Sequence, residues 1–267
     1  MNFELLWPAI LLGIVEGLTE FLPISSTGHM ILIADLIGFE GPPGKTFEIA
    51  IQLGAILAVV VAFLPKLLGI AAHMFTRYEE RYYASNILLA FLPAMVLGAT
   101  FYKPVTEFLF NPWVVSVALV VGGIVIILVE RTRRTPTILS IEELGPLGAV
   151  IIGFGQVLAM IPGTSRSGAT IIVALLLGME RRAAAEFSFV LAIPTMFAAA
   201  VFAIYKNWAD LDLTAFRLVA VGFVAAFIVA LIVVKVVMLV IGRIGFTPFG
   251  WYRIGLGVLM LGWLAVR

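Results

Sequence analysis

The sequence lacks cysteine, has two histidines and carries few charges. Without cysteine, disulfides, thiolate nucleophiles and cysteine-bound metal or iron–sulfur centres are excluded, and with only His29 and His73 a multi-histidine metal centre is not expected. Charged residues make up 12% of the 267 residues and the net charge is +1. Because the basic field that nucleic-acid binding requires is missing, no nucleic-acid partner is expected.

Hydrophobic residues take the place of the missing charges. They make up 62% of the chain, with a mean hydropathy of +1.13, whereas a soluble domain is about 45–50% apolar. A soluble globular fold is therefore excluded. The N-terminal segment MNFELLWPAI has neither a basic n-region nor a small-residue cleavage site, so we expect it to belong to the mature fold.

Six apolar stretches predict transmembrane helices, since a helix crosses the hydrocarbon core in about 20 residues. They run approximately over Phe47–Leu64, Asn86–Tyr102, Trp113–Val129, Glu186–Tyr205, Leu218–Ile241 and Gly250–Val266.

Two further apolar regions, Leu5–Ile37 and Leu147–Leu177, are each interrupted by a polar segment containing proline and glycine. The interruptions are Pro23–Gly28 and Pro162–Gly168. Their arms are too short or too polar to cross comfortably, which predicts two re-entrant helical hairpins. Irregular backbone at membrane depth persists only where it is buried in protein or lines a wet cavity, so these two breaks are the first candidates for function.

The distribution of lysine and arginine in the loops predicts the orientation. The face with fewer basic residues carries Lys45, Lys103, Lys206 and Arg267, together with the acidic Asp210 and Asp212. The richer face carries Lys66, Arg77, Arg81, Arg131, Arg133, Arg134, Arg181, Arg182 and Arg243. Nine basic residues against four place the richer face in the cytoplasm and both termini outside.

An internal repeat relates the two hairpin regions. A shift of 140 residues lays Gly13–Leu32 on Gly153–Ile172 without a gap and superposes Ser25 on Ser165. Each half, about 1–135 and about 141–267, would hold one hairpin and three spans. Because three is odd, the halves would have opposite topologies, as in many transporters. The fold class predicted is an all-α polytopic membrane protein, with six transmembrane helices and two re-entrant hairpins in an inverted-topology repeat. It forms one integral membrane domain over residues 1–267.

The first break carries two carboxylates. Glu16 and Glu20 share a helix face about one turn apart. Carboxylates at membrane depth cost several kcal/mol unless they are paired or coordinated, so binding of a divalent metal or acid–base chemistry is the favoured explanation. A pair of structural carboxylates, bonded to hydroxyls and arginine, is the alternative.

Both breaks present hydroxyls where a helix begins, and helix N-termini attract phosphate. The second break adds Arg166, whose planar guanidinium suits phosphate oxygens. Simple capping remains the alternative for the hydroxyls alone. The candidate phosphate-binding residues are Ser25, Thr27, Thr164, Ser165 and Ser167.

His29 follows Ser26 by three residues and could exchange a proton during phosphoryl transfer, although a merely hydrogen-bonded histidine is the alternative. The other intramembrane charges are explained by snorkelling or charge pairing and are not expected to be catalytic. They are Glu48, Glu186, Lys235 and Arg253.

Glu16-Gly-Leu-Thr-Glu20-Phe-Leu-Pro-Ile-Ser-Ser-Thr-Gly-His29 and Pro162-Gly-Thr-Ser-Arg-Ser-Gly168 closely resemble the two signature motifs of bacterial undecaprenyl-diphosphate phosphatases of the bacitracin-resistance type. The resemblance extends over essentially the whole chain and includes the segment Lys45-Thr-Phe-Glu48…Gln52-Leu-Gly54. No signature position departs from the family pattern.

The resemblance implies hydrolysis of undecaprenyl diphosphate to undecaprenyl phosphate and inorganic phosphate in the bacterial inner membrane, at a site facing the periplasm. It implies dependence on a divalent cation, Mg²⁺ or Ca²⁺, with Glu16 and Glu20 as metal ligands. It also implies bacitracin tolerance and recycling of the lipid carrier for peptidoglycan synthesis. The catalytic residues carried over by motif position are Glu16, Glu20, Ser26, His29 and Arg166.

Two questions stay open on sequence alone. Ser26 is the candidate nucleophile with His29 or a glutamate as base, but direct attack by water with Ser26 only binding phosphate is equally consistent. A transporter or flippase of a lipid-linked phosphate would need the same binding groups, although not a nucleophile with acid–base partners. The expected partners are the polyprenyl diphosphate and membrane lipids, and a homodimer stays open.

Overall fold

The computed structural model describes residues 3–39, 41, 46–132, 135–206 and 216–266. Over these ranges the chain is helical, with one isolated β-bridge between Ile138 and Met179. Several charged groups used for the orientation prediction lie outside the described residues or have side chains that are not described. They are Lys45, Lys103, Arg133, Arg134, Asp210, Asp212 and Arg267.

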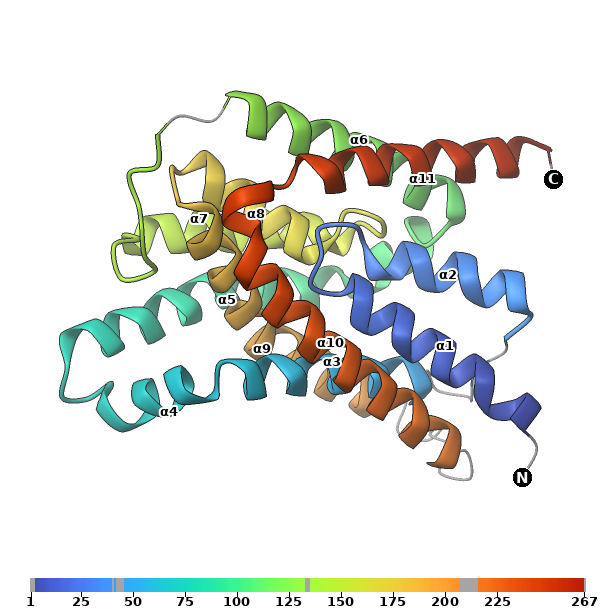
Figure 1. Ribbon diagram of the computed structural model, residues 1–267, viewed down its shortest axis with the longest axis horizontal. Helices are drawn as coiled ribbons and strands as arrows, with labels where there is room; N and C mark the ends of the chain where they lie inside the picture. The colour runs from blue at the N-terminus through green and yellow to red at the C-terminus, as the bar shows by residue number, and fades with distance from the viewer. Residues whose placement is uncertain (1–2, 40, 42–45, 133–134, 207–215, 267) are drawn as a thin grey trace.

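Six helices cover the six predicted spans (Figure 1). They are α3 (Thr46–Ala62), α5 (Tyr78–Phe108), α6 (Pro112–Thr132), α9 (Arg181–Lys206), α10 (Phe216–Ile244) and α11 (Thr247–Val266). By length and composition, five of them could cross a membrane, and a sixth span results if α3 is combined with the following helix α4 (Leu64–His73). The prediction of an all-helical protein with multiple membrane spans is therefore confirmed.

The first predicted span is not a continuous helix. α3 ends at Ala62, and α4 continues at an angle of 71°. Pro65 lies in the first turn of α4. A proline is tolerated there because the N–H groups of a first helical turn have no partner within the helix, whereas inside a longer helix it would remove a hydrogen bond. The predicted span over 47–64 thus corresponds to α3 plus the bend.

The two interrupted regions each form a pair of short helices. α1 (Phe3–Thr19) packs on α2 (Ser26–Ile37). α7 (Pro146–Val157), extended by the 3₁₀ turn η2 (Leu158–Met160), packs on α8 (Arg166–Leu176). Both breaks begin and end earlier than predicted: α1 ends at Thr19 and α2 begins at Ser26, whereas η2 ends at Met160 and α8 begins at Arg166.

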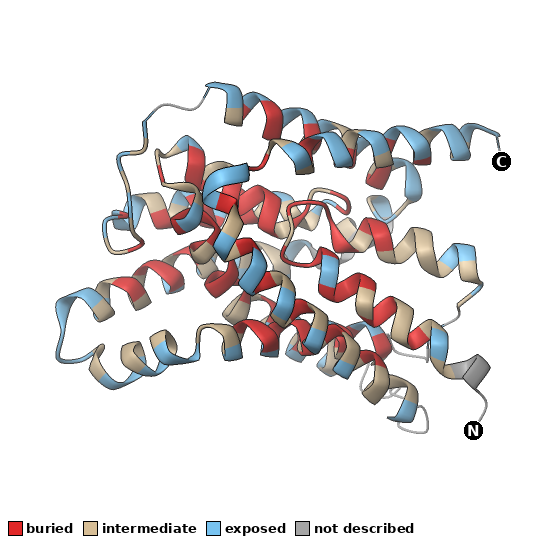
Figure 2. Cartoon of the chain, viewed as in Figure 1, coloured by how far each residue is buried: buried red, intermediate tan, exposed pale blue. Residues whose placement is uncertain are grey.

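The short pairs pack against the long helices. α1 packs on α10, α7 packs on α5, α3 packs on α9 and α10, and α6 packs on α11. Figure 2 shows the buried positions gathered in the middle of the bundle and along the backbone between α1 and α2, whereas the outward faces are exposed. Both breaks therefore lie inside the protein, as irregular backbone in a membrane requires.

Candidate active site

A cavity of about 460 Å³ opens where the two breaks meet. Its polar end is formed by residues of the breaks and of α2 and α8, and its other wall by apolar residues of α5 and α9. Six of the predicted site residues line it. They are Glu20, Ser25, Ser26, Thr27, Ser165 and Arg166.

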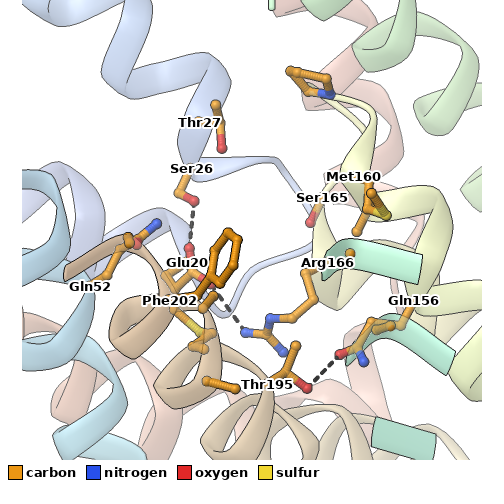
Figure 3. Close-up of a pocket in the computed structure, with 18 of the residues that line it drawn as sticks. Glu20, Ser26, Thr27, Gln52, Gln156, Met160, Ser165, Arg166, Thr195 and Phe202 are labelled. Atoms are coloured by element: carbon orange, nitrogen blue, oxygen red, sulfur yellow. Dashed lines mark hydrogen bonds and ion pairs between the residues drawn. The ribbon is translucent and has the colours of Figure 1, made fainter. Parts of the chain in front are cut away.

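Glu20 connects the two breaks within this cavity. Its Oε2 accepts a hydrogen bond of 2.5 Å from the Ser26 hydroxyl, and its Oε1 forms an ion pair of 3.2 Å with Arg166 Nη2. Figure 3 shows the resulting chain from Ser26 through Glu20 to Arg166. The carboxylate is 8% exposed. Burial strengthens both interactions, because water does not compete for the same oxygens.

Arg166 is the first residue of α8 and reaches across the cavity. Besides Glu20, it donates from Nη1 to the carbonyl oxygen of Ser188 over 2.9 Å, and its guanidinium carbon lies 5.7 Å from the ring centre of Phe21. Its Nε has no hydrogen-bond partner among the described residues. Part of its donor capacity is thus unused by the protein.

Ser25 and Ser165 have the same unusual backbone conformation. Their φ angles are 70° and 73°, and no other non-glycine residue in the described part of the chain has a positive φ. Each directly precedes a helix, α2 or α8. Such backbone costs about 1–3 kcal/mol per residue and is typical of functional sites. The two breaks therefore share a strained turn that directs a helix N-terminus towards the cavity.

The predicted hydroxyls differ in their surroundings. Ser165 caps α8 by accepting from the Gly168 N–H, whereas Ser25 makes no such side-chain bond to α2. Ser167 is fully buried and donates to the carbonyl oxygen of Leu22 over 2.9 Å, which joins the second break to the first. Neither Ser167 nor Thr164 lines the cavity.

Glu16 is buried beside Glu20, outside the lining of the cavity. It is 2% exposed, it precedes Glu20 by four residues, and its Oε1 has no hydrogen-bond partner among the described residues. Arg166 compensates the charge of Glu20, whereas a buried Glu16 carboxylate needs a proton or a further cation of its own. Glu16 can therefore hold either one.

His29 does not line the cavity and does not contact Ser26 or Glu20 through a described hydrogen bond. Its Nδ1 lies 2.8 Å from the Ser25 carbonyl oxygen and its Nε2 lies 2.7 Å from the Tyr252 hydroxyl. Because a carbonyl only accepts, Nδ1 carries the proton, so Nε2 of the neutral ring accepts from Tyr252. Both ring nitrogens are therefore engaged, Nδ1 by the backbone of the first break and Nε2 by the side chain of Tyr252.

The structure adds polar residues that the sequence analysis did not select. Gln52 of α3, Gln156 of α7 and Thr195 of α9 line the cavity. Thr195 Oγ1 lies 3.2 Å from Gln156 Oε1 (Figure 3). The repeat alignment places Gln156 opposite Glu16, which was the one available signal for it.

The remaining intramembrane charges were expected to snorkel or to form charge pairs. This prediction is confirmed for Glu186 and wrong for Arg253. Glu186 pairs with Lys66 of α4, as charge pairing predicts. Arg253 neither snorkels nor pairs with a carboxylate among the described residues, since it is 0% exposed and bonds only to backbone carbonyls. The carbonyls come from segments distant in sequence, which no local pattern reveals.

Comparison with known proteins places this geometry in a family. Residues 9–259 match the family described as bacitracin resistance protein BacA. A protein of Paramagnetospirillum magneticum named undecaprenyl-diphosphatase 2 is 55% identical, over 97% of this chain and 99% of its own. Proteins named undecaprenyl-diphosphatase are 50% identical in Sphingopyxis alaskensis, over 96% and 97% of the two chains, and 49% identical in Pseudomonas putida, over 99% and 98%. On this evidence the chain belongs to the BacA family of bacitracin resistance proteins.

Proposed function

We propose that this protein hydrolyses undecaprenyl diphosphate to undecaprenyl phosphate and inorganic phosphate. The observation that carries the proposal is the single cavity in which the Ser26–Glu20–Arg166 chain meets an apolar wall. A substrate with two charged phosphates and a long hydrocarbon tail matches both ends. The names of the relatives, which cover nearly the whole chain, agree with this substrate.

The phosphates would bind between the two breaks. The first N–H groups of α2 and α8 have no partners within their helices and favour anions. Arg166 adds a positive charge that lies opposite Ser26 across Glu20 (Figure 3). As charge shifts towards the bridging oxygen in the transition state, these donors stabilise it. Most of the rate enhancement in phosphoryl transfer comes from such electrostatic preorganisation.

The geometry favours Ser26 as the nucleophile and Glu20 as its base. The Ser26 hydroxyl already donates a hydrogen bond of 2.5 Å to Glu20, the carboxylate that would accept its proton. Attack of Ser26 Oγ on the terminal phosphorus would form a phosphoserine and break the bond to the bridging oxygen, which leaves with undecaprenyl phosphate. The serine proton would pass to Glu20. Water would then cleave the phosphoserine, giving inorganic phosphate and restoring the serine.

His29 would serve this reaction by orienting the first break. Its bonds to Ser25 and Tyr252 fix the turn that precedes Ser26. This arrangement supports a glutamate over His29 as the proton acceptor.

One experiment distinguishes Ser26 from water as the nucleophile. A trapped phosphoserine at Ser26 would favour the covalent route, whereas solvent ¹⁸O entering phosphate in a single turnover without that intermediate would favour direct attack by water.

The carboxyl pair Glu16 and Glu20 fits a divalent cation, since both groups are buried four residues apart and one oxygen of Glu16 lacks a partner among the described residues. No cluster of three or more His, Asp or Glu side chains that could hold a metal occurs in the described ranges. Mg²⁺ is typically bound by one or two carboxylates, and water and substrate phosphate oxygens complete its coordination sphere. A bound Mg²⁺ or Ca²⁺ would neutralise charge on the diphosphate.

The proposal extends to the topology. Three features support an inverted repeat of residues 1–135 and 141–267: the helical pairs at both breaks, the matching φ angles of Ser25 and Ser165, and the packing of α1 on α10, which is matched in the second half by that of α7 on α5. In such a repeat the two hairpins would be re-entrant. The charge distribution favours an inner-membrane protein with both termini outside and the cavity open to the periplasm.

The deciding experiment is phosphate release from undecaprenyl diphosphate by purified protein in detergent, with Mg²⁺ or Ca²⁺ and with chelator. Glu20→Ala, Ser26→Ala and Arg166→Ala are compared with wild type. Metal-dependent release that is lost in all three folded variants supports the proposal. If the wild type binds the lipid but releases no phosphate with any metal, the protein is not a phosphatase, and a transport assay in liposomes is required.

A further inference from the structure

Arg253 is a buried arginine whose every N–H group binds backbone. Nε donates to Leu119 O at 3.3 Å, Nη1 to Pro23 O at 3.1 Å and Thr164 O at 2.8 Å, and Nη2 to Ala118 O at 3.0 Å and Gly163 O at 2.8 Å. An arginine side chain has five N–H donors. All five are therefore used, and lysine, with three donors, could not replace them.

Three of the five carbonyls belong to the two breaks. Pro23 lies two residues before Ser25, and Gly163 and Thr164 directly precede Ser165. Ser25 and Ser165 are the two residues with strained positive φ, and Ser26 and Arg166 follow them. One guanidinium thus holds the approach to both turns and with it both helix N-termini at the cavity.

The other two carbonyls attach this guanidinium to α6. α6 and α11 pack closely, since a Cβ on Gly123 would lie 2.6 Å from Gly250 O. A Cβ on Gly122 would lie 2.2 Å from Arg253 Nη2. Because five hydrogen bonds hold the guanidinium in place, it could not move aside without releasing some of them. Glycine at this position gives the guanidinium its room.

Tyr252, the residue before Arg253 in α11, provides a second contact with the first break. The Tyr252 hydroxyl donates to His29, which donates to the Ser25 carbonyl. Consecutive residues of α11 therefore hold both sides of the Ser25 turn, whereas Arg253 alone reaches the Ser165 turn.

We propose that Arg253 is a positioning residue, which sets the geometry of Ser26 relative to Arg166 by binding the two breaks at once. Arg253 does not itself line the cavity; it acts through the carbonyls of Pro23, Thr164 and Gly163, the last of which belongs to a lining residue. The kinetic part of this proposal rests on the proposed phosphatase function. Misplacing reacting groups by about 1 Å costs roughly 100-fold in rate.

The test compares Arg253→Met and Arg253→Lys with Lys235→Met, which removes an exposed cation from the apolar helix α10. In Arg253→Met we expect kcat for undecaprenyl diphosphate to fall about 100-fold while KM changes by less than about fivefold. Arg253→Lys keeps the positive charge but has fewer N–H donors, so its kcat should fall about tenfold. Lys235→Met should retain wild-type kcat. A kcat within threefold of wild type in Arg253→Lys, or in a folded Arg253→Met, would overturn the proposal.

A second pair of variants leaves Arg253 chemically intact. Gly122→Ala displaces the guanidinium, whereas Gly255→Ala adds the same methyl group on α11 where nothing lies within 4 Å. We expect Gly122→Ala to lower kcat and Gly255→Ala to leave kcat unchanged. Equal kcat in the two variants contradicts the positioning role.

A distance measurement separates this proposal from the proposed function. The chain has no cysteine, so Leu36→Cys in α2 and Leu176→Cys in α8, both exposed, can be spin-labelled specifically. Arg253→Met or Arg253→Lys should broaden or shift the label separation measured by double electron–electron resonance, and Lys235→Met should not. An unchanged distribution overturns the proposal even if the protein is a phosphatase. A changed distribution supports it even if the wild type releases no phosphate.

Discussion

The hydroxyl of Ser26 is bound to Glu20 over 2.5 Å, and the same carboxylate binds Arg166 through its other oxygen. Glu20, from the first break, therefore binds both Ser26, the candidate nucleophile, and Arg166, the guanidinium of the second break. In the proposed mechanism Glu20 has two tasks: it accepts the serine proton, and it orients the arginine. Neither task is performed by Glu16, which lies behind it.

Replacing Glu20 by glutamine should therefore remove both functions while conserving size. General-base catalysis contributes about 10²–10⁴-fold, so we expect kcat of Glu20→Gln to fall by at least about 100-fold. Phosphate release from undecaprenyl diphosphate measures it. Glu142→Gln is the matched control, because that carboxylate is a third exposed and lies by Lys66 rather than at the cavity. Comparable rates for Glu20→Gln and wild type would rule out Glu20 as the base.

Removing the divalent cation should abolish activity, and Glu16 should determine how much cation is needed. Its unpartnered Oε1 is the available ligand atom, and loss of a carboxylate weakens metal binding. In Glu16→Gln we expect the Mg²⁺ concentration for half-maximal activity to rise about tenfold or more. Activity is titrated against free Mg²⁺, with Glu142→Gln as control. Full activity in excess chelator would contradict a metal at this pair.

Much of this arrangement follows from local sequence patterns. The six spans come from hydropathy, and the breaks come from proline, glycine and hydroxyl residues within two apolar regions. The bend after α3 was missed although Pro65 is a local signal, because the apolar run continues through it. Spacing placed Glu16 and Glu20 on one face, but which of them reaches the cavity depends on how the helices pack.

Residues whose role depends on distant partners could not be predicted. Gln52, Gln156 and Thr195 come from three different helices, and only the fold brings them together at the cavity. The carbonyl oxygens that bind Arg253 lie up to 230 residues away, so its sequence surroundings suggested only snorkelling or charge pairing. His29 was selected by its spacing from Ser26, but Tyr252 of α11 binds its Nε2. Contacts between distant segments decide each case.

The ion pair of Glu130 and Arg181 should matter for stability rather than for catalysis. The Glu130 side chain is 3% exposed and accepts two bonds from Arg181 and one from the Phe246 N–H, which ties α6 to the start of α9 and to the α10–α11 connection. Because the Arg181 side chain is 26% exposed, water can solvate it once Glu130 is removed, so the loss should be about 1–2 kcal/mol, less than for a fully buried pair. Glu130→Ala should unfold at lower SDS concentration and lower temperature than wild type, and below that temperature should retain kcat. An unchanged unfolding transition would show that the pair is not stabilising.

The apolar wall of the cavity predicts how the hydrocarbon tail is accommodated. Gly98 of α5 lines the cavity, and a Cβ built there meets nothing within 4 Å, so a side chain would extend into free space. Gly98→Leu should therefore narrow the cavity without disturbing the fold. If the tail lies against this wall, kcat/KM for undecaprenyl diphosphate should fall about tenfold or more, because a leucine in the tail's place removes apolar contact. The shorter farnesyl diphosphate should be affected less.

Gly255→Leu is the control for this substitution, since Gly255 of α11 also has open space around its Cβ but does not line the cavity. Both variants add the same side chain to a helix, so any general effect on helix stability is shared. A selective loss in Gly98→Leu that grows with the length of the polyprenyl chain would locate the tail between α5 and α9. Equal kinetics of the two variants with both substrates would mean that the tail leaves the cavity by another path, and that the apolar wall serves only to exclude water from the Ser26–Glu20–Arg166 chain.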